Sequence, residues 1–220
     1  MPSPRETPAP AEVPTQRGPR LRVSQLPLPR LRRADALLLI VDVQERLLPV
    51  VRFGPRVLER ATLLARACCA LGVPVIATEQ NPSRLGSTPE PLSSALHLSP
   101  GAAGEPGAAV EPPVFAKMQF SALTPQVLRE VERLARPSVL LCGLESHVCV
   151  LQTTLDLLER GGRVFVVEDA VSSRRARDEA VALDRMRGAG AILTTSESAL
   201  LELLGSASAP EFKSILQLIK

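Results

Sequence analysis

The stretch VLLCGLESHVCVLQTTLDLLERG (Val139–Gly161) joins an apolar run of strand length to a segment with the spacing of an amphipathic helix. The apolar run stops at Gly143, and the next six residues include a carboxylate, a histidine and a cysteine: Glu145, His147 and Cys149. A strand that leads directly into a helix is the building unit of a parallel sheet covered by helices. The sequence therefore raises the question whether Cys149 is a packed core thiol or a nucleophile held at the end of a strand.

The same alternation of apolar runs and amphipathic stretches continues on both sides of this segment, from Ala34 onward. Runs that are apolar on both faces are typical of strands in a buried parallel sheet. We expect strands within residues 35–44, 73–80, 113–120, 138–145, 163–170 and 191–198, and helices within 55–72, 124–137, 146–161, 175–190 and 206–220. The pattern predicts an α/β fold, a three-layer α/β/α sandwich.

Length and composition suit one folded domain. The chain has 220 residues, of which 45% are hydrophobic, so a sizeable core can form. No apolar run approaches the length of a membrane span, and no secretory signal is recognisable. Four cysteines without such a signal favour free thiols in a reducing compartment. We therefore expect a cytoplasmic protein with no membrane partner.

Residues 1–33 differ from the remainder in composition. They hold seven arginines against two glutamates, together with eight of the 21 prolines, which is typical of a disordered tail. This tail is either an arm for organelle targeting or for an anionic surface, or an extension without a role. The net charge of the whole chain is +3, and the tail alone contributes about +5, so the remainder is near −2. Because the folded body has no excess of positive charge, we expect no nucleic-acid partner.

The expected folded domain covers residues 34–205, followed by a C-terminal helix over 206–220. Inside the domain, residues 86–113 read GSTPEPLSSALHLSPGAAGEPGAAVEPP. A connection of this length in a compact domain is either a flexible lid over a site or a disordered insertion.

Three reactive side chains lie at or near the carboxyl ends of expected strands, where ligands bind in open parallel sheets. Asp42 is either catalytic or a structural carboxylate satisfied by loop amides. Lys117 is the sole lysine before Lys213 in a chain with 23 arginines, so the position either needs an ammonium or holds a lysine that snorkels to solvent. Cys149 lies near a helix start, which favours a thiolate and a lowered thiol pKa. The other cysteines are expected to pack in the core.

These residues resemble the isochorismatase-like cysteine hydrolases, a family that includes nicotinamidases and N-carbamoylsarcosine amidohydrolase. The resemblance covers about residues 35–205 and is carried by LLLIVDVQ, VFAKMQFSAL and VLLCGLESHVCVLQTTLDLLERG, in family order. It implies a six-stranded parallel sheet in the order 3-2-1-4-5-6, a homo-oligomer, and a catalytic triad made of Asp42, Lys117 and Cys149.

The resemblance also implies the chemistry. Asp42 would accept the proton of Cys149, Lys117 would stabilise the charged pair, and the thiolate would attack a small amide to form an acyl-thioester. The backbone N–H groups of Glu145 and Cys149 would form the oxyanion hole, aimed by a non-proline cis peptide at Leu144–Glu145. We therefore expect a hydrolase acting on C–N bonds other than peptide bonds.

Two departures from individual family members narrow this expectation. Nicotinamidases hold a metal through Asp-x-His and a further histidine, whereas this chain has ATEQNPSRLG in that place and only His97 and His147, which predicts no metal and no other cofactor. True isochorismatases lack the nucleophilic cysteine, which this chain keeps. Candidates for the walls of a small-molecule pocket are Phe120, Gln80 and His147, the last packing or lining the pocket rather than acting as a base.

Two other classes of function stay open. A binding or regulatory protein would keep the fold with little activity and would hold Cys149 sequestered or unreactive. A redox-sensing thiol protein is less favoured because no resolving cysteine lies near Cys149 in the sequence.

Overall fold

The structure is a computed structural model that describes residues 29–97 and 114–220. Most of the expected tail (1–28) and the second part of the expected loop or lid (98–113) lie outside the described residues. Within them, the strands are β1 (Ala36–Val41), β2 (Val75–Gln80), β3 (Val114–Lys117), β4 (Ser138–Leu144), β5 (Arg163–Ser172) and β6 (Ile192–Thr194). The helices are α1 (Gly54–Ala70), α2 (Pro82–Leu85), α3 (Glu90–Leu96), α4 (Pro125–Leu134), the π-helix η1 (Ser146–Val150), α5 (Leu151–Glu159), α6 (Ala176–Gly188), α7 (Ser196–Leu204) and α8 (Phe212–Ile219).

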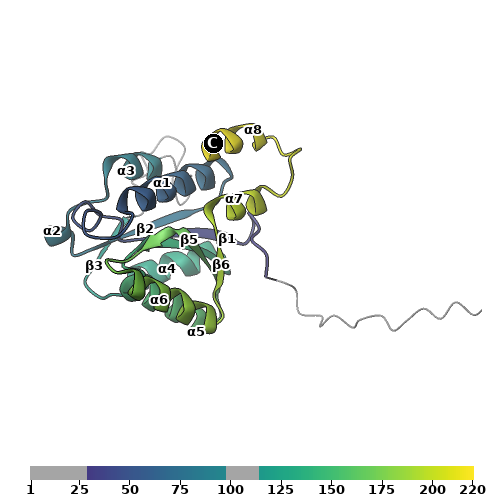
Figure 1. Cartoon of the computed structure of the whole chain (residues 1–220). Coiled ribbons are helices and arrows are strands. Elements are labelled where there is room, and N and C mark those ends of the chain that lie inside the picture. The colour runs from purple at the N-terminus through teal and green to yellow at the C-terminus, as the bar shows by residue number, and fades with distance from the viewer. Residues whose placement is uncertain (1–28, 98–113) are drawn as a thin grey trace, which may run out of the picture.

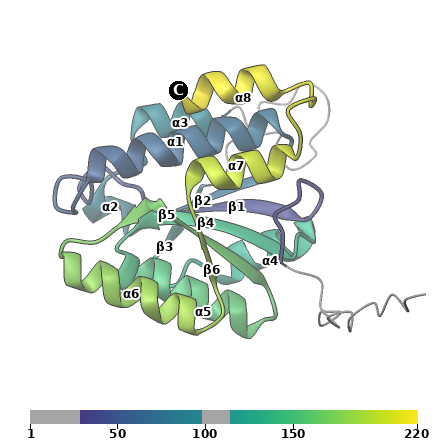
Figure 2. The same ribbon diagram turned by 45° about the vertical axis from the view of Figure 1, so that its right-hand side comes forward.

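The strands form one parallel sheet in the order β3-β2-β1-β4-β5-β6. Figures 1 and 2 show α1, α3, α7 and α8 on one face of the sheet and α4, α5 and α6 on the other. The predicted three-layer sandwich and strand order are confirmed. The chain leaves β1 toward β2 on one side and returns to β4 on the other, so the switch point where ligands bind in such sheets lies between β1 and β4.

Strand β1 runs through the centre of the core and is buried along its whole length. Its side chains alternate between the two faces, with Leu38 and Ile40 in the core under α1, and Leu37, Leu39 and Val41 in the core under α4 and α5. Burying one such side chain is worth about 2 kcal/mol. This double-sided burial explains why β1 reads as a continuous apolar run instead of an alternating one.

Two segments are helical where the sequence indicated a loop or a strand. Part of the expected loop or lid is helix α3, whose Leu92, Ala95 and Leu96 are buried against the layer that contains α1. Residues 196–198, expected to end the last strand, instead begin α7. The Thr195 side chain accepts a hydrogen bond from the Ser198 N–H and so caps this helix at its start. The spacing of apolar residues in the sequence did not distinguish α3 from a loop, or the start of α7 from a strand.

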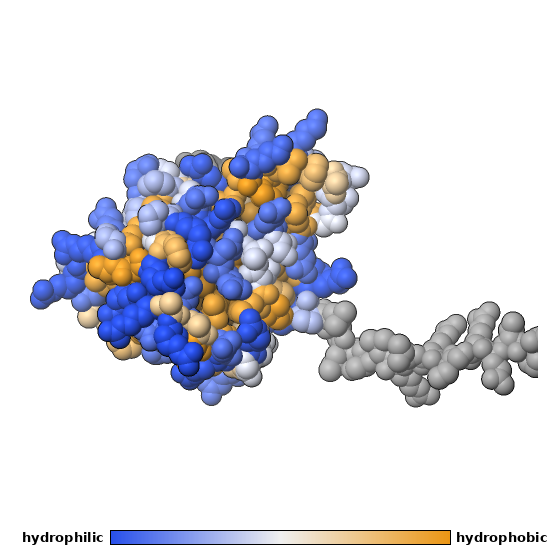
Figure 3. Space-filling view, viewed as in Figure 1, coloured by the Kyte–Doolittle hydropathy of each residue, from blue (hydrophilic) through white to orange (hydrophobic). Residues whose placement is uncertain are grey.

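The chain just before β1 packs against the C-terminal helices, although it was expected to belong to the tail. Leu31 is 2% exposed, and its N–H donates to the Glu202 carboxylate of α7 at 3.1 Å. Arg33 forms an ion pair of 2.9 Å with Glu211 at the start of α8. Ile215 on α8 is fully buried, and Figure 3 shows hydrophobic residues gathered over this end of the molecule. Residues 29–33, the described part of the expected tail, therefore belong to the folded body.

Candidate active site

Asp42, Lys117 and Cys149 meet at the carboxyl edge of the sheet. Asp42 follows β1, Lys117 ends β3, and Cys149 lies in η1, directly after β4. The Lys117 Nζ atom lies 2.7 Å from Asp42 Oδ2, and the two side chains are 0% and 1% exposed. Asp42 and Cys149 line the same cavity, and the Asp42 carboxylate is near enough to raise the pKa of the Cys149 thiol. The structure therefore brings the three sequence-predicted residues together.

The Asp42 carboxylate is held on both oxygens. Thr78 on β2 donates its hydroxyl to Oδ1 at 2.8 Å, while Lys117 occupies Oδ2. The backbone N–H of Asp42 also donates to the Thr78 carbonyl at 3.1 Å. Asp42 adopts a left-handed conformation with φ of 54°, a backbone state that is uncommon for non-glycine residues and that aspartate tolerates better than most. These contacts fix the carboxylate beside the thiol.

The Lys117 ammonium is surrounded by oxygen atoms. Besides Asp42, it donates to Gln80 Oε1 at 2.7 Å and to the carbonyl oxygens of Phe120 and Gln119 at 2.9 and 3.2 Å. A compact ammonium reaches this set of acceptors, whereas a planar guanidinium is larger and points its donors in one fork. Because the side chain is buried, the lysine does not snorkel to solvent.

Cys149 is buried but faces a cavity. It is 5% exposed, and its carbonyl accepts a 2.6 Å hydrogen bond from the Thr153 hydroxyl, which in turn accepts from the Ala122 N–H. Burial raises the pKa of the Cys149 thiol to about 12; the Asp42 carboxylate adds to this shift, and the Lys117 ammonium opposes it. The expectation of a lowered thiol pKa is therefore wrong for the free protein, because burial and the Asp42 carboxylate together outweigh the Lys117 ammonium.

The turn between β4 and η1 depends on two unusual backbone conformations. Gly143 has φ of 143°, and a Cβ there would lie 2.1 Å from the Val41 carbonyl oxygen on the neighbouring strand, so only glycine fits. Glu145 has φ of 57°. The expected cis peptide at Leu144–Glu145 is wrong, since no described peptide bond is cis. The left-handed Glu145 directly precedes η1, and Glu145, Val148 and Cys149 line the cavity.

A cavity of about 380 Å³ opens next to Cys149. Of the expected wall residues, Phe120 and Gln80 line it, and Phe120 is 54% exposed at its rim. His147 does not line it; its Nδ1 lies 3.0 Å from the Ser173 hydroxyl and its Nε2 3.7 Å from Glu145 Oε2. The complete lining is Asp42, Leu47, Val50, Gln80, Leu85, Phe120, Leu144, Glu145, Val148, Cys149 and Arg174.

Sequence reasoning missed three residues that build this site. Thr78 and Gln44 are fully or almost fully buried polar side chains, and Gln44 holds Gln80 in place through both its backbone N–H and its carbonyl, at 2.8 and 3.1 Å. Arg174 pairs with Glu145 at 3.1 Å. A signal for the first two was present, since each is a polar residue at the end of an apolar strand. Nothing near Arg174 in the sequence distinguished it from the arginines around it.

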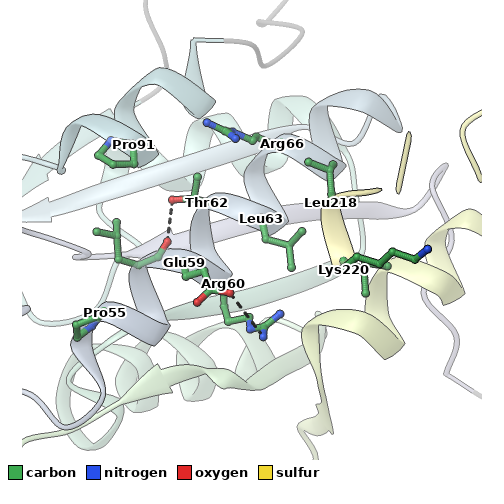
Figure 4. Close-up of a pocket in the computed structure, with 11 residues that line it drawn as sticks. Pro55, Glu59, Arg60, Thr62, Leu63, Arg66, Pro91, Leu218 and Lys220 are labelled. Carbon is green, nitrogen blue, oxygen red and sulfur yellow. Dashed lines mark hydrogen bonds and ion pairs between the residues drawn. The ribbon is translucent and has the colours of Figure 1, made fainter. Parts of the chain in front are cut away.

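A second cavity, of about 500 Å³, lies between α1, α3 and α8, within the helical layer to which they belong. Figure 4 shows Leu63 and Leu218 facing it, with Arg66 and Lys220 near its edges. It includes none of the three candidate catalytic residues. In residues 29–97 and 114–220, no His, Cys, Asp or Glu side chains group as three or more potential metal ligands. In the same residues, no helix is both long and apolar enough to cross a membrane.

The fold is that of the isochorismatase-like family. The chain matches the isochorismatase domain over residues 36–198 and belongs to that family. It is 44% identical to the secreted isochorismatase effector Isc1 of Phytophthora sojae, over 88% of each chain. It is 41% identical to human isochorismatase domain-containing protein 2, over 88% of this chain and 87% of the relative.

Solved structures agree with this assignment. A structure described as MAR1 ribonuclease from Caenorhabditis elegans has a TM-score of 0.77 and 38% identity, over 87% of this chain and 92% of that one. YcaC from Pseudomonas aeruginosa, described with hexane-2,5-diol and covalent acrylamide, has a TM-score of 0.74 and 27% identity, over 87% and 92%. YcaC from Escherichia coli, described as an octameric hydrolase of unknown specificity, has a TM-score of 0.76 and 26% identity, over 88% and 90%.

Proposed function

We propose that this protein is a cysteine hydrolase that cleaves the C–N bond of a small amide through an acyl-thioester at Cys149, without a metal. The observation that carries the proposal is the convergence of three groups in one place. The Cys149 thiol and Asp42 line one cavity of about 380 Å³, the Asp42 carboxylate acts on the pKa of the thiol, and Asp42 is paired with the buried Lys117. A nucleophile with an adjacent base, which a third group orients, is the arrangement that covalent catalysis requires.

In the proposed reaction, the thiol stays protonated until the substrate carbonyl reaches it, as its raised pKa requires. Asp42 takes the thiol proton while Sγ forms a bond to the carbonyl carbon, and the Lys117 ammonium stabilises the developing charge. Asp42 then returns the proton to the amide nitrogen, the C–N bond breaks, and the amine leaves. Water next attacks the thioester with Asp42 as base, the C–S bond breaks, and the acid and the free thiol are formed. The N–H groups of Glu145 and Cys149 would bind the oxyanion in both steps, each worth about 3 kcal/mol.

The solved neighbours support hydrolase chemistry, whereas a covalent acrylamide, which accepts nucleophiles at its vinyl carbon, does not report on attack at an amide carbonyl. The P. aeruginosa YcaC structure is described with covalent acrylamide, and the E. coli protein is described as a hydrolase. The C. elegans neighbour is described as a ribonuclease. We propose a small-molecule substrate and no RNA for this chain, because Arg174, the cation among the residues that line the cavity, is already paired with Glu145 and is not free for phosphate.

A second candidate function is a binding or regulatory role with little catalysis. It is favoured by the burial of Cys149, which is 5% exposed; burial raises the pKa of the thiol to about 12 and leaves it almost wholly protonated at neutral pH. The two candidates differ in whether Asp42 removes this proton once a substrate fills the cavity.

The test is a panel of small primary amides, with ammonia release as the readout and with mass spectrometry of the intact protein during turnover. An active hydrolase releases ammonia, carries an acyl group that hydroxylamine removes, and loses both properties in Cys149→Ala. Cys69→Ala, which changes a half-buried thiol on α1, is the matched control and keeps both. Saturable binding of an amide without ammonia release or acylation would favour the binding protein.

We also infer that the protein forms homo-oligomers in the cytoplasm. The octameric E. coli neighbour supports assembly, as do the exposed apolar side chains of Val50, Phe53, Met118 and Phe120 on the loops after β1 and β3. None of the four cysteines is joined in a disulfide, in keeping with a reducing compartment, although the P. sojae relative is described as secreted. Light scattering of the purified chain tests the assembly, and fractionation of cells that express it with and without residues 1–28 tests the location.

A further inference from the structure

The cavity beside Cys149 carries two pairs of opposite charges. Asp42 is paired with Lys117 at its base, and Glu145 is paired with Arg174 at its side. The remaining lining residues apart from the Cys149 thiol are uncharged, and most are apolar: Leu47, Val50, Gln80, Leu85, Phe120, Leu144 and Val148. The charges therefore cancel, and neither pair leaves a cation or an anion free for a substrate.

The Glu145–Arg174 pair has the geometry of a bidentate fork. Arg174 Nε donates to Glu145 Oε1 at 3.2 Å and Nη2 donates to Oε2 at 3.1 Å. Glu145 is only 10% exposed, whereas the Arg174 side chain is 59% exposed. The carboxylate thus occupies the guanidinium face that an anionic substrate would use. To reach the guanidinium, an anionic substrate would have to displace the almost buried Glu145 carboxylate. Leaving that carboxylate unpaired costs more free energy than the new ion pair supplies.

Arg174 is held in this position by its neighbours in the chain. The Ser173 carbonyl accepts a hydrogen bond from the Arg52 N–H at 3.0 Å, and the Ser172 hydroxyl donates to the Arg52 carbonyl. These bonds tie the loop after β5 to the segment that precedes α1. The guanidinium therefore extends from an anchored loop, and the ion pair is a built part of the cavity wall.

We propose that this site selects uncharged, mainly apolar small amides, and that the Glu145–Arg174 pair sets this selectivity by cancelling charge at the cavity wall. The inference rests on the proposed function and narrows its substrate class. Bringing a charged group into contact with apolar side chains costs its hydration, and here no free countercharge offsets that cost. Arg174 is on this account a specificity-determining residue, and Glu145 has a side-chain role separate from that of its backbone N–H.

The first test uses thiol reagents of different charge and needs no turnover. The rate of Cys149 modification is measured with iodoacetamide, with its anionic near-isostere iodoacetate and with cationic 2-bromoethylamine, each divided by the rate of the same reagent with N-acetylcysteine. Peptide mass spectrometry locates the modified cysteine. Since ratios between reagents are compared on one variant at one pH, the ionisation of Cys149 cancels.

In the wild type, we expect the normalised rate with iodoacetamide to exceed both charged reagents by about tenfold. Arg174→Gln leaves Glu145 unpaired and should raise the rate with 2-bromoethylamine by about tenfold, while Glu145→Gln should raise the rate with iodoacetate by a similar factor. The double variant should return to the wild-type preference. Because a protonated His147 would add a charge 3.7 Å from Glu145, the series is repeated in a His147→Gln background, where the same order is expected.

A wild-type preference for iodoacetate, or unchanged ratios in both single variants, would overturn the inference. The second test compares hydrolysis of butyramide, succinamate and β-alaninamide in the wild type and in Arg174→Gln. Butyramide is expected to have the highest kcat/KM in the wild type, and succinamate the lowest in Arg174→Gln. If no amide of any charge is hydrolysed while the alkylation ratios behave as expected, the proposed function fails and the charge selectivity of the cavity stands. If hydrolysis occurs but favours a charged amide, the proposed function stands and this inference fails.

Discussion

The Lys117 ammonium lies 2.7 Å from the Asp42 carboxylate, and neither side chain is accessible to solvent. A buried ion pair adds little net stability, because the desolvation of both charges offsets their attraction. Removing one partner, however, leaves an uncompensated charge in the core. The pair therefore ties the stability of the fold to the residues that we propose for catalysis.

The first prediction concerns Lys117→Met, which removes the ammonium at similar chain length. We expect the free energy of unfolding to fall by about 3–5 kcal/mol, because Asp42 loses its countercharge, and amide hydrolysis to be lost. Urea denaturation and ammonia release check both. Lys213→Met, at an exposed position on α8, is the matched control and should leave both values near wild type. An unchanged urea midpoint in Lys117→Met would contradict the role given to the pair.

The second prediction separates thiol reactivity from turnover. Asp42→Asn should reduce hydrolysis by at least about a hundredfold, because the proton acceptor is lost. The same change should speed alkylation of Cys149 by iodoacetamide, because the Asp42 carboxylate raises the pKa of that thiol and Lys117 lowers it. The control is Asp184→Asn, at an exposed carboxylate of α6. Slower alkylation together with unchanged turnover would mean that Asp42 does not act on Cys149.

The third prediction is the pH dependence of Cys149 alkylation. With the pKa raised to about 12, the thiolate fraction, and with it the alkylation rate, should rise about tenfold per pH unit across pH 7–10 without a plateau. Labelling at each pH, quantified on the peptide that contains Cys149, measures this. A plateau below pH 8 would show a thiolate already formed in the free protein and would restore the expectation drawn from the helix start.

The sequence could predict the sheet and the three reactive residues for identifiable physical reasons. Strands such as β1 are buried on both faces, so they appear as unbroken apolar runs. Asp42 directly follows such a run, Lys117 interrupts a shorter one, and Cys149 lies a few residues after a third, near the start of the expected helix. The carboxyl ends of parallel strands meet at one edge of the sheet, which made their convergence predictable from topology.

Other features depend on contacts that the sequence does not display. The pKa of Cys149 follows from the burial of one side chain and its distance from two charges. Arg174 lies 29 residues from Glu145 in the chain and is one of 23 arginines, so only the folded loop after β5 singles it out. The left-handed backbone of Glu145, where the resemblance implied a cis peptide, and the close approach of Gly143 to Val41 are likewise visible only in the folded chain.

The fourth prediction concerns the close approach of Gly143 to Val41. Gly143→Ala would place a methyl group 2.1 Å from the Val41 carbonyl oxygen at a backbone φ of 143°, so β1 and β4 would have to separate beside the site. We expect a loss of at least about 2 kcal/mol in stability and a strong loss of hydrolysis. Gly188→Ala on α6 meets no neighbouring atom within 4 Å and should be neutral or slightly stabilising. Equal urea midpoints for both variants would contradict the role of Gly143.

The fifth prediction is a loss of stability at alkaline pH. Burial raises the pKa of the Cys68 and Cys142 thiols, and that of Cys149 to about 12. In the unfolded chain these thiols lose their protons near pH 8.5, while the folded protein keeps them. The unfolded state then binds fewer protons, so the free energy of unfolding should fall by up to about 1.4 kcal/mol per pH unit for each thiol above that pH.

Below about pH 8 the contribution of these thiols to stability is complete, and it is lost as the pH rises toward the folded-state pKa values. The chain contains no tyrosine, so phenol ionisation does not overlap with that of the thiols. Urea denaturation of the wild type and Cys142→Ala between pH 7 and 10.5 measures the effect. The variant loses stability at every pH through its cavity, but its curve should decline less steeply, by the share of one thiol. Parallel curves would show that the Cys142 thiol ionises alike in the folded and unfolded chains. That result would contradict the effect on its pKa that we assign to burial in β4.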